Sequence, residues 1–222
     1  MDAPAQKPQV TIDIVSDVMC PWCYIGKKRL ENALAEVGDD VDVKVQWMPY
    51  QLDATLPKMG KDRQQYFIDK FGSLDAYAQV YAPIREAGAA EGIPFKLDDI
   101  KVSPNTMDAH RLIHWAGQDY GLEVQHELVS ILMRFYFEEG KNIGDNEVLL
   151  EAAKLADMGV DYMRERLESD EDKELITGQI QSMQAAGVSG VPFFIINKKY
   201  ALQGAQPKEH IALVIQDVAQ KS

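Results

Sequence analysis

The chain has 222 residues, of which 46% are hydrophobic and 26% charged, so it is long enough to bury a large core and differs from disordered or fibrous chains. Its formal net charge of −12 repels phosphate backbones and anionic lipids, so neither nucleic acid nor a membrane is expected as a partner. No window approaches the roughly 20 apolar residues of a membrane span, and the polar N-terminal segment lacks the apolar core of a signal peptide, which predicts a cytoplasmic protein.

A β-α-β unit is predicted at the start of the chain. Residues 10–15 form a β-branched run typical of a buried strand, and residues 24–37 show helical spacing of apolar side chains. Residues 41–47 alternate between apolar and polar, which indicates a half-buried strand. Such a unit normally forms a parallel strand pair, and functional sites in open α/β sheets gather at the carboxyl ends of the strands.

The motif Cys20-Pro21-Trp22-Cys23 contains the only two cysteines of the chain and lies between the first strand and the first helix. A thiol at a helix N-terminus meets unsatisfied backbone N–H groups and the positive end of the helix dipole, which both favour the reactive thiolate. The spacing lets the two sulfurs close a small disulfide, or lets Cys23 resolve a mixed one. We therefore predict a reactive dithiol.

From about residue 60 to residue 186 the pattern changes to successive helices without a strong strand. Breaks are expected at Pro83, at residues 92–94 and 103–104, and at three later glycines: Gly121, Gly140 and Gly159. Strand character returns at residues 192–196 and 200–204, which predicts a hairpin, and a final helix opens at Pro207. The expected division is a discontinuous domain of residues 1–55 and 187–222 around a helical insertion of residues 56–186.

This order of elements, with a two-cysteine site early and Val191-Pro192 before a late strand, resembles the DsbA family of thioredoxin-fold oxidoreductases. The likeness is strongest to the FrnE-like branch, in residues 16–26, 103–106, 109–112 and 187–192. The resemblance implies an α/β fold: a thioredoxin fold with a large all-helical insertion. It also implies a cis Val191-Pro192 bond beside the dithiol, an exposed nucleophilic Cys20 and a shielded resolving Cys23.

The function implied by the resemblance is a thiol-disulfide oxidoreductase acting on protein or peptide disulfides, with Pro21, Trp22, Val191 and Pro192 shaping the site. Trp22 lacks an imidazole that could further stabilise the thiolate, so a moderate reduction potential is expected. In a reducing compartment this favours reduction or isomerisation over net oxidation. No cofactor is predicted, although glutathione stays open as a reductant or ligand, and the oligomeric state is not fixed.

Other polar residues allow two interpretations each. Asn105, Thr106 and His110 could line a substrate groove near the dithiol, or the first two could cap a helix. Ser16 and Asp17 could shape proton transfer or simply end the first strand. No metal site is predicted, because two cysteines would need a second chain to hold zinc, and His110 is not followed by the Glu of a metalloprotease helix.

Two competing functions remain. Kappa-class glutathione transferases and hydroxychromene carboxylate isomerases resemble the chain in fold and insertion, but they have a serine where this chain has Cys20. A non-catalytic chaperone-like protein, in which the insertion binds unfolded chains, is the other alternative. It predicts that replacing Cys20 with serine leaves the function intact.

Overall fold

The structure is a computed structural model and describes residues 7–221. Its main sheet has four strands in the order β2-β1-β5-β6: β1 (Gln9–Ser16), β2 (Asp42–Pro49), β5 (Phe193–Ile196) and β6 (Tyr200–Gln203). β1 and β2 are parallel, with Val10 opposite Val43, whereas β5 is antiparallel to both β1 and β6. Both ends of the chain therefore contribute to one sheet, as predicted, and the predicted fold class is confirmed.

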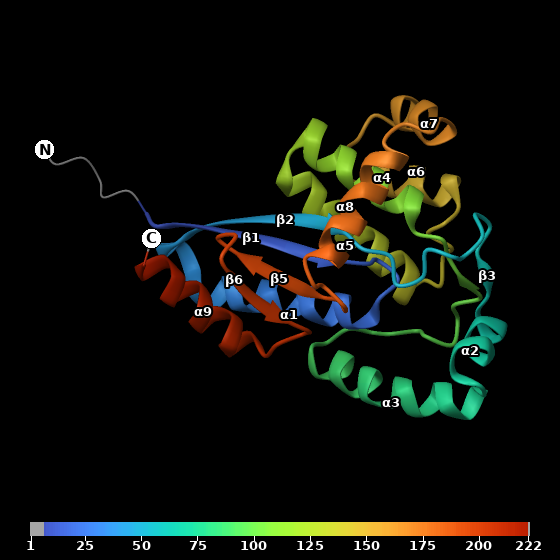
Figure 1. Ribbon diagram of the computed structural model, residues 1–222, viewed down its shortest axis with the longest axis horizontal. Coiled ribbons are helices and arrows are strands. Elements are labelled where there is room, and N and C mark those ends of the chain that lie inside the picture. Colours follow the sequence, from blue (N-terminus) through green and yellow to red (C-terminus); the bar gives the residue numbers. More distant parts are fainter. Residues whose placement is uncertain (1–6, 222) are drawn as a thin grey trace, which may run out of the picture.

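Two helices cover one face of this sheet, α1 (Pro21–Val37) and α9 (Lys208–Gln220), and they pack against each other (Figure 1). α1 begins at Pro21, three residues before its apolar repeat, because proline suits the first position of a helix. A short 3-10 turn, η1 (Gly38–Asp40), leads from α1 to β2. β5 begins one residue after Pro192, which has no N–H to give to a strand ladder.

The segment between β2 and β5 is mainly helical, and some of its helices pack against β2 whereas another packs against α1 (Figure 1). Its helices are α2 (Arg63–Phe71), α3 (Leu74–Ala90), α4 (Met107–Trp115), α5 (Leu122–Phe137), α6 (Asn146–Leu155), α7 (Val160–Glu168) and α8 (Lys173–Ala185). A π-helical turn, η2 (Ala116–Tyr120), continues α4.

Two details of this segment differ from the expectation. It is not wholly helical, because β3 (Lys61–Asp62) pairs with β4 (Val102–Ser103), and strands of two residues are too short to show a period in the sequence. The helix expected to break at Pro83 continues through it as part of α3. Tyr81 and Ile84 on either side of the proline are buried, so tertiary packing offsets the lost backbone hydrogen bond.

One continuous core joins the sheet to the inserted helices. It includes Ile12 and Ile14 of β1 and Leu30 of α1 together with Leu132 and Phe137 of α5. One face of α5 is apolar and is buried there. Among residues 7–221, no helix is long and apolar enough to cross a bilayer.

Candidate active site

The dithiol lies where the sequence predicts it, at the carboxyl end of β1 and the start of α1. Cys20 is the residue before the helix and has an extended backbone, while Cys23 lies in the first turn. The N–H groups of Cys23 and Tyr24 donate to the Cys20 carbonyl at 3.0 and 3.3 Å, which closes that turn. The Cys20 sulfur therefore lies at the positive end of the dipole of α1.

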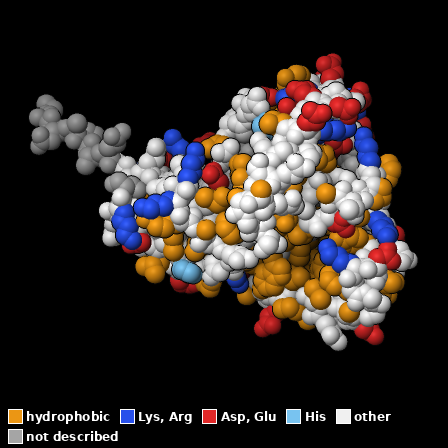
Figure 2. Space-filling view, viewed as in Figure 1, with side chains coloured by type: hydrophobic (Ala, Val, Ile, Leu, Met, Phe, Trp, Pro, Cys, Tyr) orange, Lys and Arg blue, Asp and Glu red, His pale blue; other side chains and the backbone are white. Residues whose placement is uncertain are grey.

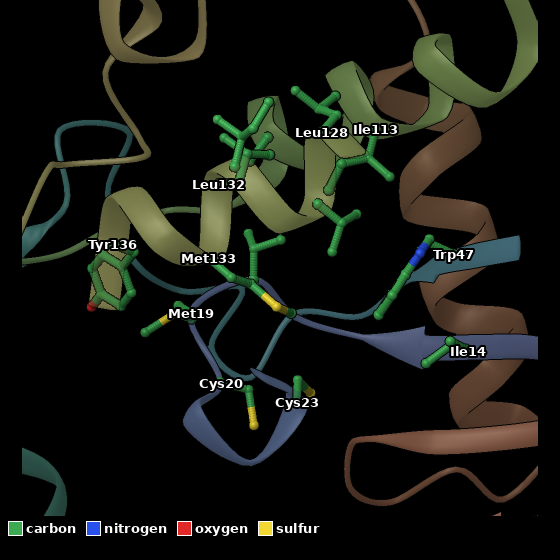
Figure 3. Close-up of a cluster of buried hydrophobic side chains, with 14 of the residues drawn as sticks. Ile14, Met19, Cys20, Cys23, Trp47, Ile113, Leu128, Leu132, Met133 and Tyr136 are labelled. Atoms are coloured by element: carbon green, nitrogen blue, oxygen red, sulfur yellow. The ribbon is translucent and has the colours of Figure 1, made fainter. Parts of the chain in front are cut away.

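The expected exposure of Cys20 is wrong. Only 4% of Cys20 and 0% of Cys23 are accessible, and both are free thiols within the core cluster. A segment distant in the sequence contacts Cys20, because its sulfur donates to the Val191 carbonyl at 3.7 Å. The Cys20 sulfur nevertheless points away from the apolar side chains that pack above the loop (Figure 3).

Cys23 is the more deeply buried thiol, and its surroundings hold it protonated. Burial raises the pKa of Cys23 well above its ordinary value, and the hydrogen bond and charge of Cys20 raise it further. Contacts with Ser16 and with the Asp17 backbone oppose this rise but do not outweigh it. Attack by Cys23 therefore requires that its proton be removed during the reaction.

Val191 and Pro192 lie beside the dithiol, and the bond between them is cis, as the resemblance implies. Pro192 is buried against α1, where a Cβ on Gly26 would meet its ring at 2.8 Å. The glycine thus lets the loop before β5 approach the first turns of α1. Pro21 is buried, whereas Trp22 is half-buried and packs against the core cluster.

The residues expected in a substrate groove do not form an open surface. Thr106 and His110 are 2% and 3% exposed, so little of either side chain is open to a substrate, and their role in a groove stays a prediction. Asn105 is half-buried, with its Oδ1 accepting from the Met107 N–H at 3.0 Å and its Nδ2 donating to the Leu56 carbonyl at 2.6 Å. The first of these bonds matches the capping alternative for Asn105, because Met107 is the first residue of α4, whereas Thr106 makes no side-chain capping bond.

His110 instead lies beside Asp17, a residue of the short loop that leads from β1 to Cys20. Its Nε2 is 3.5 Å from Asp17 Oδ1, and the carboxylate is fully buried. Asp17 accepts backbone N–H bonds from Met19 at 3.3 Å and Leu52 at 2.8 Å, which fixes the loop that leads to Cys20. Asp17 therefore fixes the backbone that follows β1, and its carboxylate lies near the imidazole.

Sequence reasoning missed Arg63 and Tyr81, which the insertion buries against each other. Tyr81 accepts from Arg63 at 3.3 Å and interacts electrostatically with Cys20. An arginine in the first turn of an amphipathic helix is ordinarily solvent-exposed, so the pattern gave no signal of its burial.

Apolar residues of α3, including Leu74 and Val80, remain exposed, and apolar side chains gather over α3 in Figure 2. Among the residues described, no group of three or more acidic, histidine or cysteine side chains could hold a metal ion.

Comparison with known proteins adds to this geometry. Residues 11–216 match the family described as the DSBA-like thioredoxin domain. A probable DsbA oxidoreductase from Streptomyces coelicolor is 27% identical, with a TM-score of 0.82 over 96% of this chain and 91% of the other. The cytosolic disulfide reductase DsbM from Pseudomonas aeruginosa, crystallised with GSH, is 17% identical, with a TM-score of 0.64 over 94% and 98% of the two chains. A 2-hydroxychromene-2-carboxylate isomerase is 12% identical, with a TM-score of 0.67 over 95% of each chain.

Proposed function

Because this chain belongs to the DSBA-like thioredoxin domain family, we propose that it reduces or isomerises protein disulfides through Cys20 and Cys23. The observation that carries the proposal is the pair of free thiols at the start of α1, one of them against the Val191 carbonyl. An extended substrate segment could pair with the backbone at Val191 while its disulfide meets Cys20. The exposed apolar residues of α3 support a polypeptide substrate.

In the proposed reaction the Cys20 thiolate attacks one sulfur of the substrate disulfide, and the other sulfur leaves with the bonding electron pair. Cys23 then loses its proton and attacks the Cys20 sulfur, which breaks the mixed disulfide and releases the second substrate thiol. The enzyme is left with a Cys20–Cys23 disulfide, and two electrons have passed to the substrate. A small thiol such as glutathione is proposed to restore the dithiol.

Two considerations favour reduction or isomerisation over net oxidation. Trp22 provides no imidazole to stabilise the Cys20 thiolate further, which favours a moderate potential. The similar DsbM is described as a cytosolic disulfide reductase and was crystallised with GSH, which supports a reducing compartment and a role for glutathione. Membership of the FrnE-like branch stays a prediction from motifs such as residues 187–192. The likeness to the isomerase concerns the fold alone, and Cys20 favours redox chemistry over that alternative.

The first test is access to Cys20, because so little of it is exposed. Iodoacetamide should modify Cys20 in the reduced native protein, and mass spectrometry after proteolysis should find Cys23 unmodified. A native protein whose Cys20 stays unmodified, although urea-unfolded protein reacts, would contradict the proposal.

The second test is turnover with insulin as substrate and glutathione as reductant. Cys20→Ser should abolish reduction, whereas Cys23→Ser should form a mixed disulfide with the substrate that is visible on a non-reducing gel. Glutathione conjugation that survives Cys20→Ser would favour the transferase alternative. Prevention of aggregation that survives it, without any reductase activity in the parent, would favour the chaperone-like alternative.

A further inference from the structure

One long edge of the main sheet is only partly covered. β2 is the outermost strand on this side, because the strand order among the described residues ends with it. Near the carboxyl end of β2, the Gln125 side chain of α5 bonds both the N–H and the carbonyl of Trp47 and so closes the edge there. The amino-terminal part of β2 extends beyond the inserted helices (Figure 1). Residues 42–46 form this open edge.

The backbone groups of Val43 and Val45 point outward from the open edge. Successive residues of a strand direct their N–H and carbonyl groups to opposite sides. The Asp42 N–H donates to the Pro8 carbonyl on the β1 side, whereas the Trp47 N–H points the other way, to α5. Odd-numbered residues of β2 therefore face outward, and no strand among residues 7–221 pairs with them on that side. Such an edge is a template for a further strand.

The two faces of the open edge differ in chemistry. Val43 and Val45 pack partly against the core cluster, whereas Asp42 and Lys44 on the opposite face are exposed. Neither charged side chain forms an ion pair within the described part of the chain, although one oxygen of Asp42 accepts from Gln9 at 2.8 Å. One acid and one base, two residues apart on the same face, are complementary to an antiparallel copy of themselves.

We propose that the open edge is a self-association surface, on which β2 of a second copy of this chain pairs antiparallel with β2. A dimer with a two-fold axis uses the same patch of both subunits, and two strands related by such an axis within one sheet run antiparallel. The four-stranded sheets of the two protomers would then join into one continuous sheet. This inference is independent of the proposed function.

The charges select one register for the strand pair. With Val43 opposite the partner's Val43, Asp42 lies opposite the partner's Lys44, and by symmetry Lys44 lies opposite the partner's Asp42. Sliding the partner strand by two residues would instead place Lys44 against Lys44 or Asp42 against Asp42, and like charges directly opposite are destabilising. In the selected register the outward groups of Val43 and Val45 meet outward groups of the partner.

The chain around the open edge fits this register. The 3-10 turn η1 precedes β2, so the partner's strand turns away before it reaches Trp47, and the bonds of Gln125 to that residue stay intact. The paired Val43 side chains would cover apolar surface that is now half-exposed. Because the two β1 strands run in opposite directions, the dithiols at their carboxyl ends lie at opposite ends of the joined sheet. Pairing therefore leaves both sites free.

The first test is sedimentation equilibrium over a wide range of protein concentrations. The contact is short and each chain carries a net charge of −12, so the parent should dimerise reversibly and dissociate on dilution. Lys44→Asp and Asp42→Lys should each raise the dissociation constant about tenfold or more, because both place like charges opposite each other twice. The double variant with both substitutions exchanges the charges and should restore the dimer.

Lys154→Asp on the exposed surface of α6 is the matched control, because it changes the net charge as Lys44→Asp does. Its dissociation constant should stay within about twofold of that of the parent. Circular dichroism checks the folding of each variant. Insulin reduction should be the same in all of them, and an inactive parent would count against the proposed function alone.

The second test is amide hydrogen exchange at two concentrations. The amides of Val43 and Val45 should exchange more slowly at high concentration in the parent, but not in Lys44→Asp. Val43→Pro removes an N–H that β1 does not use, so it should abolish dimerisation and leave the monomer folded. A parent that is monomeric at every concentration would overturn the inference. So would a dimer that neither Val43→Pro nor Lys44→Asp weakens, or one that the exchanged charges fail to restore.

Discussion

Arg63 is a buried cation whose described hydrogen-bond partners are tyrosines rather than carboxylates. It is 4% exposed, and it donates to Tyr136 at 2.6 Å and to Tyr81 at 3.3 Å. Its guanidinium also lies 4.7 Å from the centre of the Phe67 ring. A planar group can satisfy both hydroxyls and the ring face at once, which a single ammonium cannot.

Arg63→Lys should therefore lower the free energy of unfolding by about 2 kcal/mol, because one of the charged hydrogen bonds is lost and a hydroxyl is left unpaired. Urea unfolding measures the change. Arg85→Lys is the matched control, since Arg85 is 42% exposed and pairs with an exposed aspartate, Asp98. Equal losses in the two variants would show that the tyrosine contacts contribute nothing.

Gly26 is the second residue whose substitution has a defined consequence. An added Cβ would lie 2.8 Å from Pro192 Cγ and 3.5 Å from the Phe194 ring, and neither ring is a flexible chain end. Gly26→Ala should destabilise the protein by about 1–3 kcal/mol through overpacking, despite the higher helix propensity of alanine. The added methyl group should also displace the loop before β5, which contacts Cys20 through Val191. Alkylation of Cys20 and disulfide turnover should therefore both become slower.

Gly178 in α8 provides the control, because a Cβ there would meet nothing within 4 Å. Gly178→Ala should stabilise the protein by about 0.5–1 kcal/mol, as alanine does in an unobstructed helix. If thermal melting showed both alanine variants to be stabilised, the close approach of Pro192 to α1 would be incorrect.

At the scale of elements, a hydrogen-bonded chain ties β2, α5 and α1 together. The Trp47 indole donates to His126 Nδ1 at 3.3 Å, and His126 Nε2 lies 3.1 Å from Glu31, which also pairs with Lys27. An indole nitrogen only donates, so Nδ1 accepts and the Nε2 proton is directed at the carboxylate. Burial alone would raise the pKa of Glu31, but His126 and Lys27 outweigh it and lower the pKa from 4.5 to about 2.

This shift makes the stability acid-sensitive. Because the folded pKa lies below the unfolded one, the contribution is present above pH 4.5 and is lost as the pH falls to about 2. Glu31 is 32% exposed, so solvent screening reduces the contribution to about 1–2 kcal/mol. Glu31→Gln should therefore be less stable than the parent by that amount at mildly acidic pH and equal to it near the folded pKa.

Urea unfolding at several acidic pH values measures this difference. Glu36→Gln, which removes a carboxylate 3.7 Å from exposed Lys208, is the control and should show little pH-dependent difference from the parent. A constant gap between Glu31→Gln and the parent down to the lowest pH would exclude the proposed pKa shift as its cause.

At the scale of the whole molecule, inserted helices and sheet share one core and should unfold together. Gln125 on α5 accepts from the Trp47 N–H at 2.9 Å and donates to the Trp47 and Ile113 carbonyls at 3.3 and 3.2 Å. Its side chain thus satisfies backbone groups of β2, an edge strand of the main sheet. The division at residues 55 and 187 stays a prediction, and a shared core argues for one cooperative transition.

Gln125→Leu should lower the free energy of unfolding by about 2–4 kcal/mol, since buried backbone groups of Trp47 lose their partners. The midpoint of the single transition should fall accordingly. Far-ultraviolet circular dichroism and tryptophan fluorescence should report coincident curves in parent and variant. Gln184→Leu on the exposed face of α8 should change little. Two separated transitions in the parent would show that the insertion unfolds on its own.

The sequence by itself determined the β-α-β and β-β-α units, the helical character of the insertion and the place of the dithiol. These features depend on local properties: the period of apolar side chains, a proline at a helix start and two cysteines one turn apart. It did not resolve the β3–β4 pair or the passage of α3 through Pro83, because neither leaves a local period.

Only the tertiary structure decided which polar and reactive groups are buried. Cys20 lies against Val191, Arg63 lies against tyrosines, and His110 is placed beside Asp17 at the wall of a cavity. The partners in each case are far apart in the chain. Burial is a property of what packs across from a residue, and no pattern within one segment contains that information.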